Sequence, residues 1–131
     1  MKNDISDRND IILLVDTFYK SVVLNQQIGP VFTDVAKVDW AHHLPKMYDF
    51  WESILFGKAI YKGNPMLSHF ALNKKTPLQS GQFNIWKNLF FQTVDDLFTG
   101  PNAELMKQKA QSIADLMHFK INSPPPKIKI V

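Results

Sequence analysis

Apolar residues recur at helical spacing in four stretches of the chain. The first covers residues 10–26 and the second residues 39–56. The third follows Ser80 and stops before Gly100, and the fourth covers residues 102–121. No stretch alternates apolar and polar residues as a half-buried strand does, and no internal repeat is evident. The pattern therefore predicts an all-α fold.

Breaking and capping residues delimit these helices. Gly29-Pro30 stops the first helix, Val31-Phe32 then begins a short turn or a single-turn helix, and Gly57 ends the second helix. Pro45 lies inside the second stretch, so that helix either kinks there or begins near Leu44. The expected N-capping residues are Asn9, Ser80 and Asn102.

Residues 57–81 contain three Gly and two Pro and show no long period. We expect a loop with one short helix over residues 67–72. A long irregular segment inside a compact domain is uncommon unless it serves a function or is held by a ligand. This segment is the first indication of a cofactor.

The chain length of 131 residues fits one domain. We expect a folded domain over residues 1–121 and a disordered tail over 122–131, where the run SPPPKIKIV cannot be helical through its prolines. The ten Phe and three Trp are many for this length. They suit either a tightly packed helical core or a pocket with ring-shaped walls.

The formal charge of +3 comes from scattered lysines, and no motif for nucleic-acid binding accompanies it. The absence of cysteine excludes disulfides, thiolate metal sites and cysteine nucleophiles. Residues 1–10 are polar, and no apolar run approaches about 18 residues. We therefore expect a cytoplasmic protein without nucleic-acid binding or membrane insertion.

Histidines are the only nitrogen donors suited to a metal, and they do not form an HExxH pattern. His69 differs from the others, because apolar Met66-Leu67 and Phe70 flank it. Such a histidine is either packed and satisfied by a hydrogen bond, or a neutral imidazole that offers a nitrogen to a metal. A haem needs only one strong axial protein ligand in an apolar site. The other three histidines are His42, His43 and His118.

Aromatic residues on the predicted helices are suited to pack against a porphyrin, although each also fits an ordinary core. These residues are Phe32, Phe50, Phe83 and Trp86, with Met47 filling space beside them. Tyr19 lies at the edge of an apolar stripe, so its hydroxyl is expected to be half-buried and in need of a partner. The Tyr19 hydroxyl and the Trp86 indole can each donate a hydrogen bond to iron-bound oxygen or to the backbone.

Five segments together resemble the group III truncated haemoglobins: FYKSV, IGPVF, HHLPKMYDFW, YKGNPMLSH and FNIWKNLF. The resemblance spans residues 10–120. It implies a truncated globin fold, a two-on-two helical sandwich around a haem b, with the first two long helices on one side and the last two on the other.

The resemblance also implies roles for particular residues. His69, in the PMxxH stretch, is the implied iron ligand, and Tyr19, His43 and Trp86 are the implied distal residues. His42 adds an alternative, because either neighbouring histidine can turn towards the pocket mouth. His118 matches no functional position and is expected at the surface. The implied haem-pocket residues are Phe18, Phe32, Lys46, Met47, Phe50, Leu67 and Phe83, with Lys46 either paired with a haem propionate or solvated.

The expected function is the binding of O2, NO or CO at a histidine-ligated haem iron. One alternative is a haem-dependent redox enzyme of the NO dioxygenase or peroxidase type, served by an electron-donating reductase. Another is a haem-free helical interaction module. We expect a monomer or a weak homo-oligomer.

Overall fold

The computed structural model describes residues 2–35, 37–58 and 80–122, and these residues form helices and no strands. The prediction of an all-α fold is therefore confirmed for this part of the chain. The elements are α1 (Arg8–Leu24), the single π-helical turn η1 (Val31–Val35), α2 (Trp40–Phe56), α4 (Ser80–Leu97) and α5 (Pro101–Asn122).

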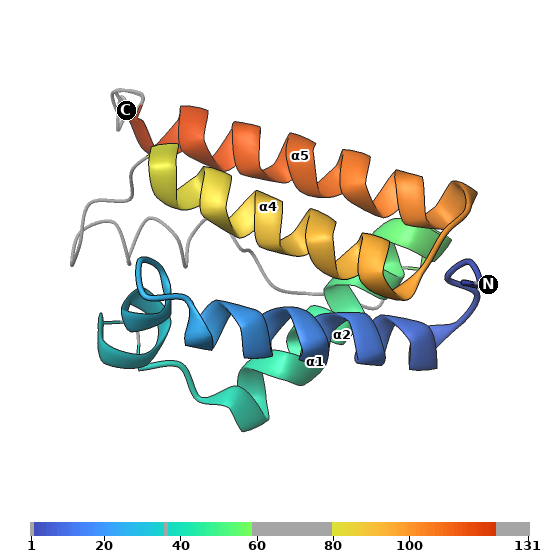
Figure 1. The fold of residues 1–131 in the computed structure, drawn as a ribbon, viewed down its shortest axis with the longest axis horizontal. Coiled ribbons are helices and arrows are strands. Elements are labelled where there is room, and N and C mark those ends of the chain that lie inside the picture. The colour runs from blue at the N-terminus through green and yellow to red at the C-terminus, as the bar shows by residue number, and fades with distance from the viewer. Residues whose placement is uncertain (1, 36, 59–79, 123–131) are drawn as a thin grey trace, which may run out of the picture.

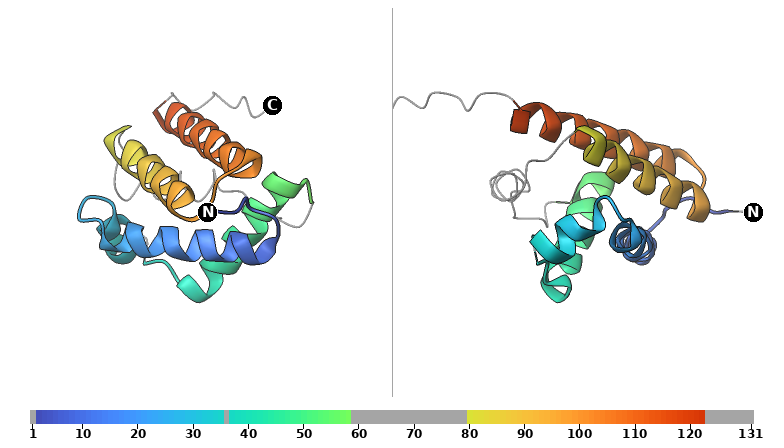
Figure 2. Two further views of the ribbon diagram at one scale, coloured as in Figure 1. Left: turned by 45° about the vertical axis from the view of Figure 1, so that its right-hand side comes forward. Right: turned by 60° about the vertical axis from the view of Figure 1, so that its left-hand side comes forward.

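The helices form two pairs. α4 and α5 run side by side, while α1 packs against α4 and α2 crosses α1 and reaches α5 (Figure 1). The two further views in Figure 2 show the same pairing, with α1 and α2 together on one side and α4 and α5 on the other. The expected two-on-two arrangement of helices is therefore present.

The predicted apolar stripe of α1 forms the centre of the core. Side chains three and four positions apart lie on one face of a helix, and that face of α1 is buried against α4 and α2. Apolar residues from α4, α5 and the N-terminal segment complete the core. Its largest fully buried side chains are Ile5, Ile11, Leu14, Val15, Phe18, Val22, Phe90, Val94 and Met106.

Aspartates are the N-capping residues of α1 and α2. The carboxylate of Asp7, and not the expected Asn9, caps α1 by accepting a hydrogen bond of 3.1 Å from the amide of Asp10. Asp39 caps α2 in the same way through the amide of Ala41. Because α1 begins at Arg8, Asn9 lies inside its first turn and cannot be the N-cap.

α2 is one continuous helix that contains Pro45. The proline lies early in the helix, so the backbone hydrogen bond that its missing N–H removes is near the N-terminal end of α2 and not in its middle. This settles the start of the helix at Trp40 and not near Leu44. Gly57 follows α2 in the left-handed conformation, with φ of 68°, and ends the helix as expected.

The N-terminal segment caps α5. Both carboxylate oxygens of Asp4 accept hydrogen bonds from α5 amides, 3.0 Å from Asn102 and 2.9 Å from Ala103. The Asn102 side chain instead donates to the carbonyl of Ile5 at 2.7 Å. The prediction of Asn102 as N-cap was therefore wrong, because α5 already begins at Pro101 and Asn102 lies inside its first turn, where the Asp4 carboxylate accepts from the first free amides. α4 begins at Ser80 itself, one residue earlier than a Ser80 cap would allow.

Gly100 makes the close approach of Asp4 possible. Its φ is 141°, and a Cβ atom there would lie 2.5 Å from Cγ of Asp4. The amide of Thr99 donates to the carbonyl of Asn3, and the Lys2 ammonium donates to the carbonyl of Asp95. The segment before α1 is thus fixed to the turn between α4 and α5.

Residues 59–79 and 123–131 lie outside the described part of the chain, so the short helix expected over residues 67–72 and most of the expected loop and tail are not described. α5 ends at Asn122, one residue beyond the expected boundary. No helix in the described ranges is long and apolar enough to cross a membrane.

Candidate functional site

Tyr19 of α1 lies at the centre of an aromatic cluster with residues from η1 and α2. Its ring centroid is 5.1 Å from that of His43, 5.3 Å from that of Trp40 and 6.1 Å from that of Phe32. Tyr19 is only 7% exposed, and burial raises the pKa of its phenol above the ordinary value of 10.0. Tyr19 therefore keeps its proton at neutral pH and is suited to donate a hydrogen bond.

The side of α2 that meets Tyr19 is set by helical spacing. Trp40 and His43 are three positions apart, so their side chains share one face, and their rings lie 5.7 Å apart. His43 is half-buried with its Nε2 atom inside, whereas the neighbouring His42 is exposed. Of the two histidines, His43 is the one that faces Tyr19.

Phe18 continues the cluster towards α4. Its ring contacts Tyr19 at 4.9 Å, and it presents an edge to Trp86 at 5.6 Å and to Phe90 at 5.1 Å. Phe18 is fully buried, while Trp86 is half-buried. Consecutive side chains on α1 thus join the rings of α2 to those of α4.

A stack of three nearly parallel rings, those of Trp86, Phe90 and Trp51, lies between α4 and α2. Trp86 and Phe90 are 5.9 Å apart with an interplanar angle of 13°, and Phe90 and Trp51 are 4.8 Å apart with an angle of 22°. Both separations are typical of offset-stacked rings. Trp51 is 3% exposed, so this stack leads from the half-buried Trp86 into the core.

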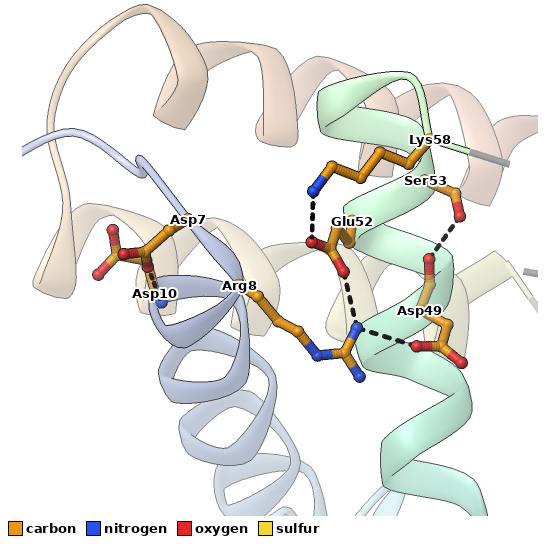
Figure 3. Close-up of polar contacts among 7 residues, drawn as sticks. All are labelled: Asp7, Arg8, Asp10, Asp49, Glu52, Ser53 and Lys58. Atoms are coloured by element: carbon orange, nitrogen blue, oxygen red, sulfur yellow. Dashed lines mark hydrogen bonds and ion pairs between the residues drawn. The ribbon is translucent and has the colours of Figure 1, made fainter. Parts of the chain in front are cut away.

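Ion pairs fix the C-terminal half of α2 to the start of α1 (Figure 3). Arg8 lies 2.7 Å from Glu52 and 2.9 Å from Asp49, and Lys58 lies 3.3 Å from the other oxygen of Glu52. The hydrogen bond from Arg8 is the main reason why the pKa of the buried Glu52 is lowered. These ion pairs hold α1, which carries Tyr19, and α2, which carries His43, in one relative position.

Comparison with known proteins supports one family. No family model matches the chain. The protein described as "Group 3 truncated hemoglobin ctb", from Campylobacter jejuni subsp. jejuni serotype O:2, is 28% identical over 123 residues, which cover 92% of this chain and 93% of that protein. The crystal structure of a group III truncated hemoglobin from Campylobacter jejuni matches with a TM-score of 0.78 and 27% identity, covering 90% of this chain and 93% of that one. This chain has a truncated globin fold. The resemblance to group III truncated haemoglobins is thus confirmed.

The truncated globin fold gives the expected pocket residues different surroundings. Phe32, Met47 and Phe50 are half-buried against the core, and Lys46 is exposed without an ion pair among the described residues. Phe83 packs on the ring of His118 of α5 at 5.4 Å. The sequence led us to expect His118 at the surface, but it is half-buried. His69 and Leu67 lie outside the described residues.

Sequence reasoning missed two members of this aromatic cluster. Neither Trp40 nor Phe90 was named as a site residue from the sequence, yet each contacts a proposed site residue. Their spacing in the sequence indicates that they are neighbours of site residues, because Trp40 precedes His43 by three positions and Phe90 follows Trp86 by four on one helix.

Proposed function

We propose that this truncated globin binds O2, NO or CO at the iron of a haem b. The observation that carries the proposal is the aromatic cluster around Tyr19, in a fold that matches a group III truncated hemoglobin over 90% of the chain. A protonated, buried phenol beside a histidine and an indole is the kind of polar group that a gas-binding haem pocket uses.

The described residues fit a haem. A porphyrin needs a largely apolar, aromatic-lined site with few polar groups. Apolar side chains of η1, α2 and α4 pack against the core while remaining only partly buried, so each keeps surface that a flat ligand can cover. These side chains are Phe32, Trp40, Met47, Phe50 and Trp86.

The proposed iron ligand is His69, on the strength of the PMLSH segment in the sequence resemblance. The haem would supply an iron that binds a diatomic gas. Lys46, exposed one helical turn beyond His43, is proposed to pair with a haem propionate.

The distal residues would act through hydrogen bonds. Tyr19 is buried and keeps its phenolic proton, and we propose that it donates this proton in a hydrogen bond to a bound ligand that carries partial negative charge. A charge-assisted hydrogen bond in a water-poor site is stronger than one in water. Trp86 is proposed as a second donor, and His43 is proposed to line the pocket beside Tyr19.

Absorption spectra of the purified protein test this function. Wild type is expected to show a Soret band that shifts when dithionite and CO are added, and His69→Ala is expected to lose or alter it. His42→Ala is the matched control, because His42 is an exposed histidine. No Soret band in wild type after haemin addition would instead support a haem-free helical interaction module.

A second candidate function is a haem-dependent redox enzyme of the NO dioxygenase or peroxidase type. The observation that favours it is the proximity of Tyr19 to His43, which places two polar groups together. Strong donors slow the release of oxygen, and a bound oxygen that stays longer has more time to react. Such an enzyme requires an electron donor, for which a reductase is the proposed partner.

A further inference from the structure

The stack of Trp86, Phe90 and Trp51 connects the candidate pocket with the α1–α2 side of the molecule. Its ring separations are 5.9 Å and 4.8 Å, and the three planes are nearly parallel. Phe18 presents its edge to both α4 rings and holds them in place. Indoles are among the most easily oxidised side chains, and an intervening phenyl ring shortens the gap that an electron must cross between them.

Tyr48 lies on α2 one helical turn before Trp51, the most deeply buried tryptophan of this stack. It precedes Trp51 by three positions, so the two side chains are neighbours on one helix, with Cβ atoms roughly 5–6 Å apart. Tyr48 is half-buried, and its hydroxyl donates a hydrogen bond to the Asp16 carboxylate of α1. The Arg8 guanidinium lies 5.9 Å from the centre of its ring.

The environment of Tyr48 is suited to the loss of an electron together with a proton. Burial, with Asp16 as the next cause, raises the pKa of Tyr48 to about 12, so the phenol is protonated at neutral pH. Oxidation of a phenol greatly increases its acidity. Asp16 is already hydrogen-bonded to that proton and can accept it without rearrangement.

We propose that Trp86, Phe90, Trp51 and Tyr48 form an electron relay from the surface of α2 to the haem, and that Tyr48 is the site where small phenols or ascorbate-like reductants are oxidised. The proposal rests on the haem binding proposed above. It assigns a peroxidase-type activity with a substrate class and a surface site separate from the gas-binding pocket.

The chemistry balances with hydrogen peroxide as oxidant. Tyr48 loses one electron to the relay and its phenolic proton to Asp16, which leaves a neutral phenoxyl radical. A reductant then returns one electron to Tyr48, Asp16 returns the proton, and the oxidised reductant releases a proton to solvent. Two such cycles deliver the two electrons that, with two protons, break the O–O bond of one peroxide and yield two waters.

Radical trapping tests the relay in the haem-loaded protein. The Soret band is measured first, peroxide is added with a nitrone spin trap, and the labelled residues are located by mass spectrometry. The wild type is expected to carry the label on Tyr48, and haem-free protein given the same peroxide is expected to carry none there. Phe90→Leu and Trp51→Phe are expected to lose the label at Tyr48. Phe91→Leu is the matched control for Phe90→Leu, because Phe91 is a neighbouring α4 ring outside the stack.

Asp16→Asn separates a redox role of Tyr48 from a structural one. Removal of the proton acceptor is expected to move the label from Tyr48 to Trp51, while the haem spectrum stays unchanged. The relay is overturned if the haem-loaded wild type carries no label at Tyr48. It is also overturned if Tyr48 is still labelled in both Phe90→Leu and Trp51→Phe. Either result leaves the proposal of haem binding intact. Failure of the wild type to take up haem overturns both proposals and is seen before peroxide is added.

Discussion

The carboxylate of Asp4 accepts a hydrogen bond from the amide of Ala103, 99 positions later in the chain. The same carboxylate also accepts from Asn102, so one side chain satisfies two of the amides that a helix N-terminus leaves without a partner. The negative charge is favourable there because the N-terminus of a helix carries partial positive charge. Asp4 therefore ties the start of the chain to the last helix of the fold.

Asp4→Ala is expected to lower the free energy of unfolding by about 1–2 kcal/mol, the usual loss for an N-capping side chain. Urea unfolding followed by far-UV circular dichroism measures it, with all variants in the same haem-loading state. Asp115→Ala is a suitable control, because Asp115 is an exposed aspartate in α5 away from its start. An unchanged unfolding midpoint in Asp4→Ala would show that the cap contributes nothing to stability.

The contribution of Asp4 is expected to depend on pH. Burial acts to raise its pKa, but three backbone N–H groups lower it more, to a net value below 3.8. A carboxyl with a depressed folded-state pKa stabilises the protein above its unfolded pKa, and this stabilisation is lost as pH falls through the folded value. The difference between wild type and Asp4→Ala should thus be constant between about pH 5 and 7 and should shrink below about pH 4. Urea titrations at a series of pH values check this, and a gap that widens in acid would contradict it.

Gly100→Ala is expected to destabilise the fold by about 1–3 kcal/mol or more, because alanine is strained at a φ of 141° and its Cβ would lie 2.5 Å from Asp4 Cγ. Gly81→Ala is the matched control. Among the described residues, nothing beyond its chain neighbours and its own helix backbone lies within 4 Å of a Cβ at Gly81, in the first turn of α4, so that variant should be neutral or slightly stabilised. Thermal unfolding of the two variants side by side gives the comparison, and equal melting temperatures would refute the steric account.

Tyr19→Phe is expected to keep the haem and to release oxygen about 10-fold to 100-fold faster, because it removes one charge-assisted donor of about 1.5–3 kcal/mol. Stopped-flow mixing of the oxygenated protein with CO measures the dissociation rate. Tyr48→Phe is the control, since the Tyr48 hydroxyl is bonded to Asp16. If oxygen leaves the Tyr19 variant at the wild-type rate, Tyr19 has no distal role.

Glu52→Gln is expected to lower the free energy of unfolding by about 1–3 kcal/mol, because it leaves Arg8 and Lys58 without the buried carboxylate between them. Glu104→Gln is the contrasting variant. Glu104 is an exposed partner of Lys107 within one helix, so its loss should cost at most about 0.5 kcal/mol. Guanidinium unfolding of both proteins tests the ranking, and a Glu104 effect as large as that of Glu52 would show that burial is not the cause.

Local pattern was sufficient to predict the helices. The positions of α1, α2, α4 and α5 follow from helical spacing of apolar residues and from Gly and Pro between them, and both signals act over only a few residues. The errors fell at the helix starts. Asn9 and Asn102 are suitable caps by residue type, but Asp7 and Asp4 take their places.

The candidate site was only partly predictable. Sequence resemblance selected Tyr19 and His43 together, and the structure brings their rings to 5.1 Å. His42 remained an alternative at that point, because either of the two neighbouring histidines could turn towards the pocket mouth. Only the packing of α2, which includes the Arg8–Glu52 ion pair, decides which histidine turns inwards.

The sequence by itself therefore determined the all-α class, the extents of the main helices and the resemblance to truncated globins, since these depend on local spacing and on residue identity. The tertiary structure decided the Asp4 cap on α5, the inward histidine and the Trp86–Phe90–Trp51 stack. Each of these joins residues from different helices or segments. Their contact energy depends on how whole elements pack, and no local pattern along the chain carries that information.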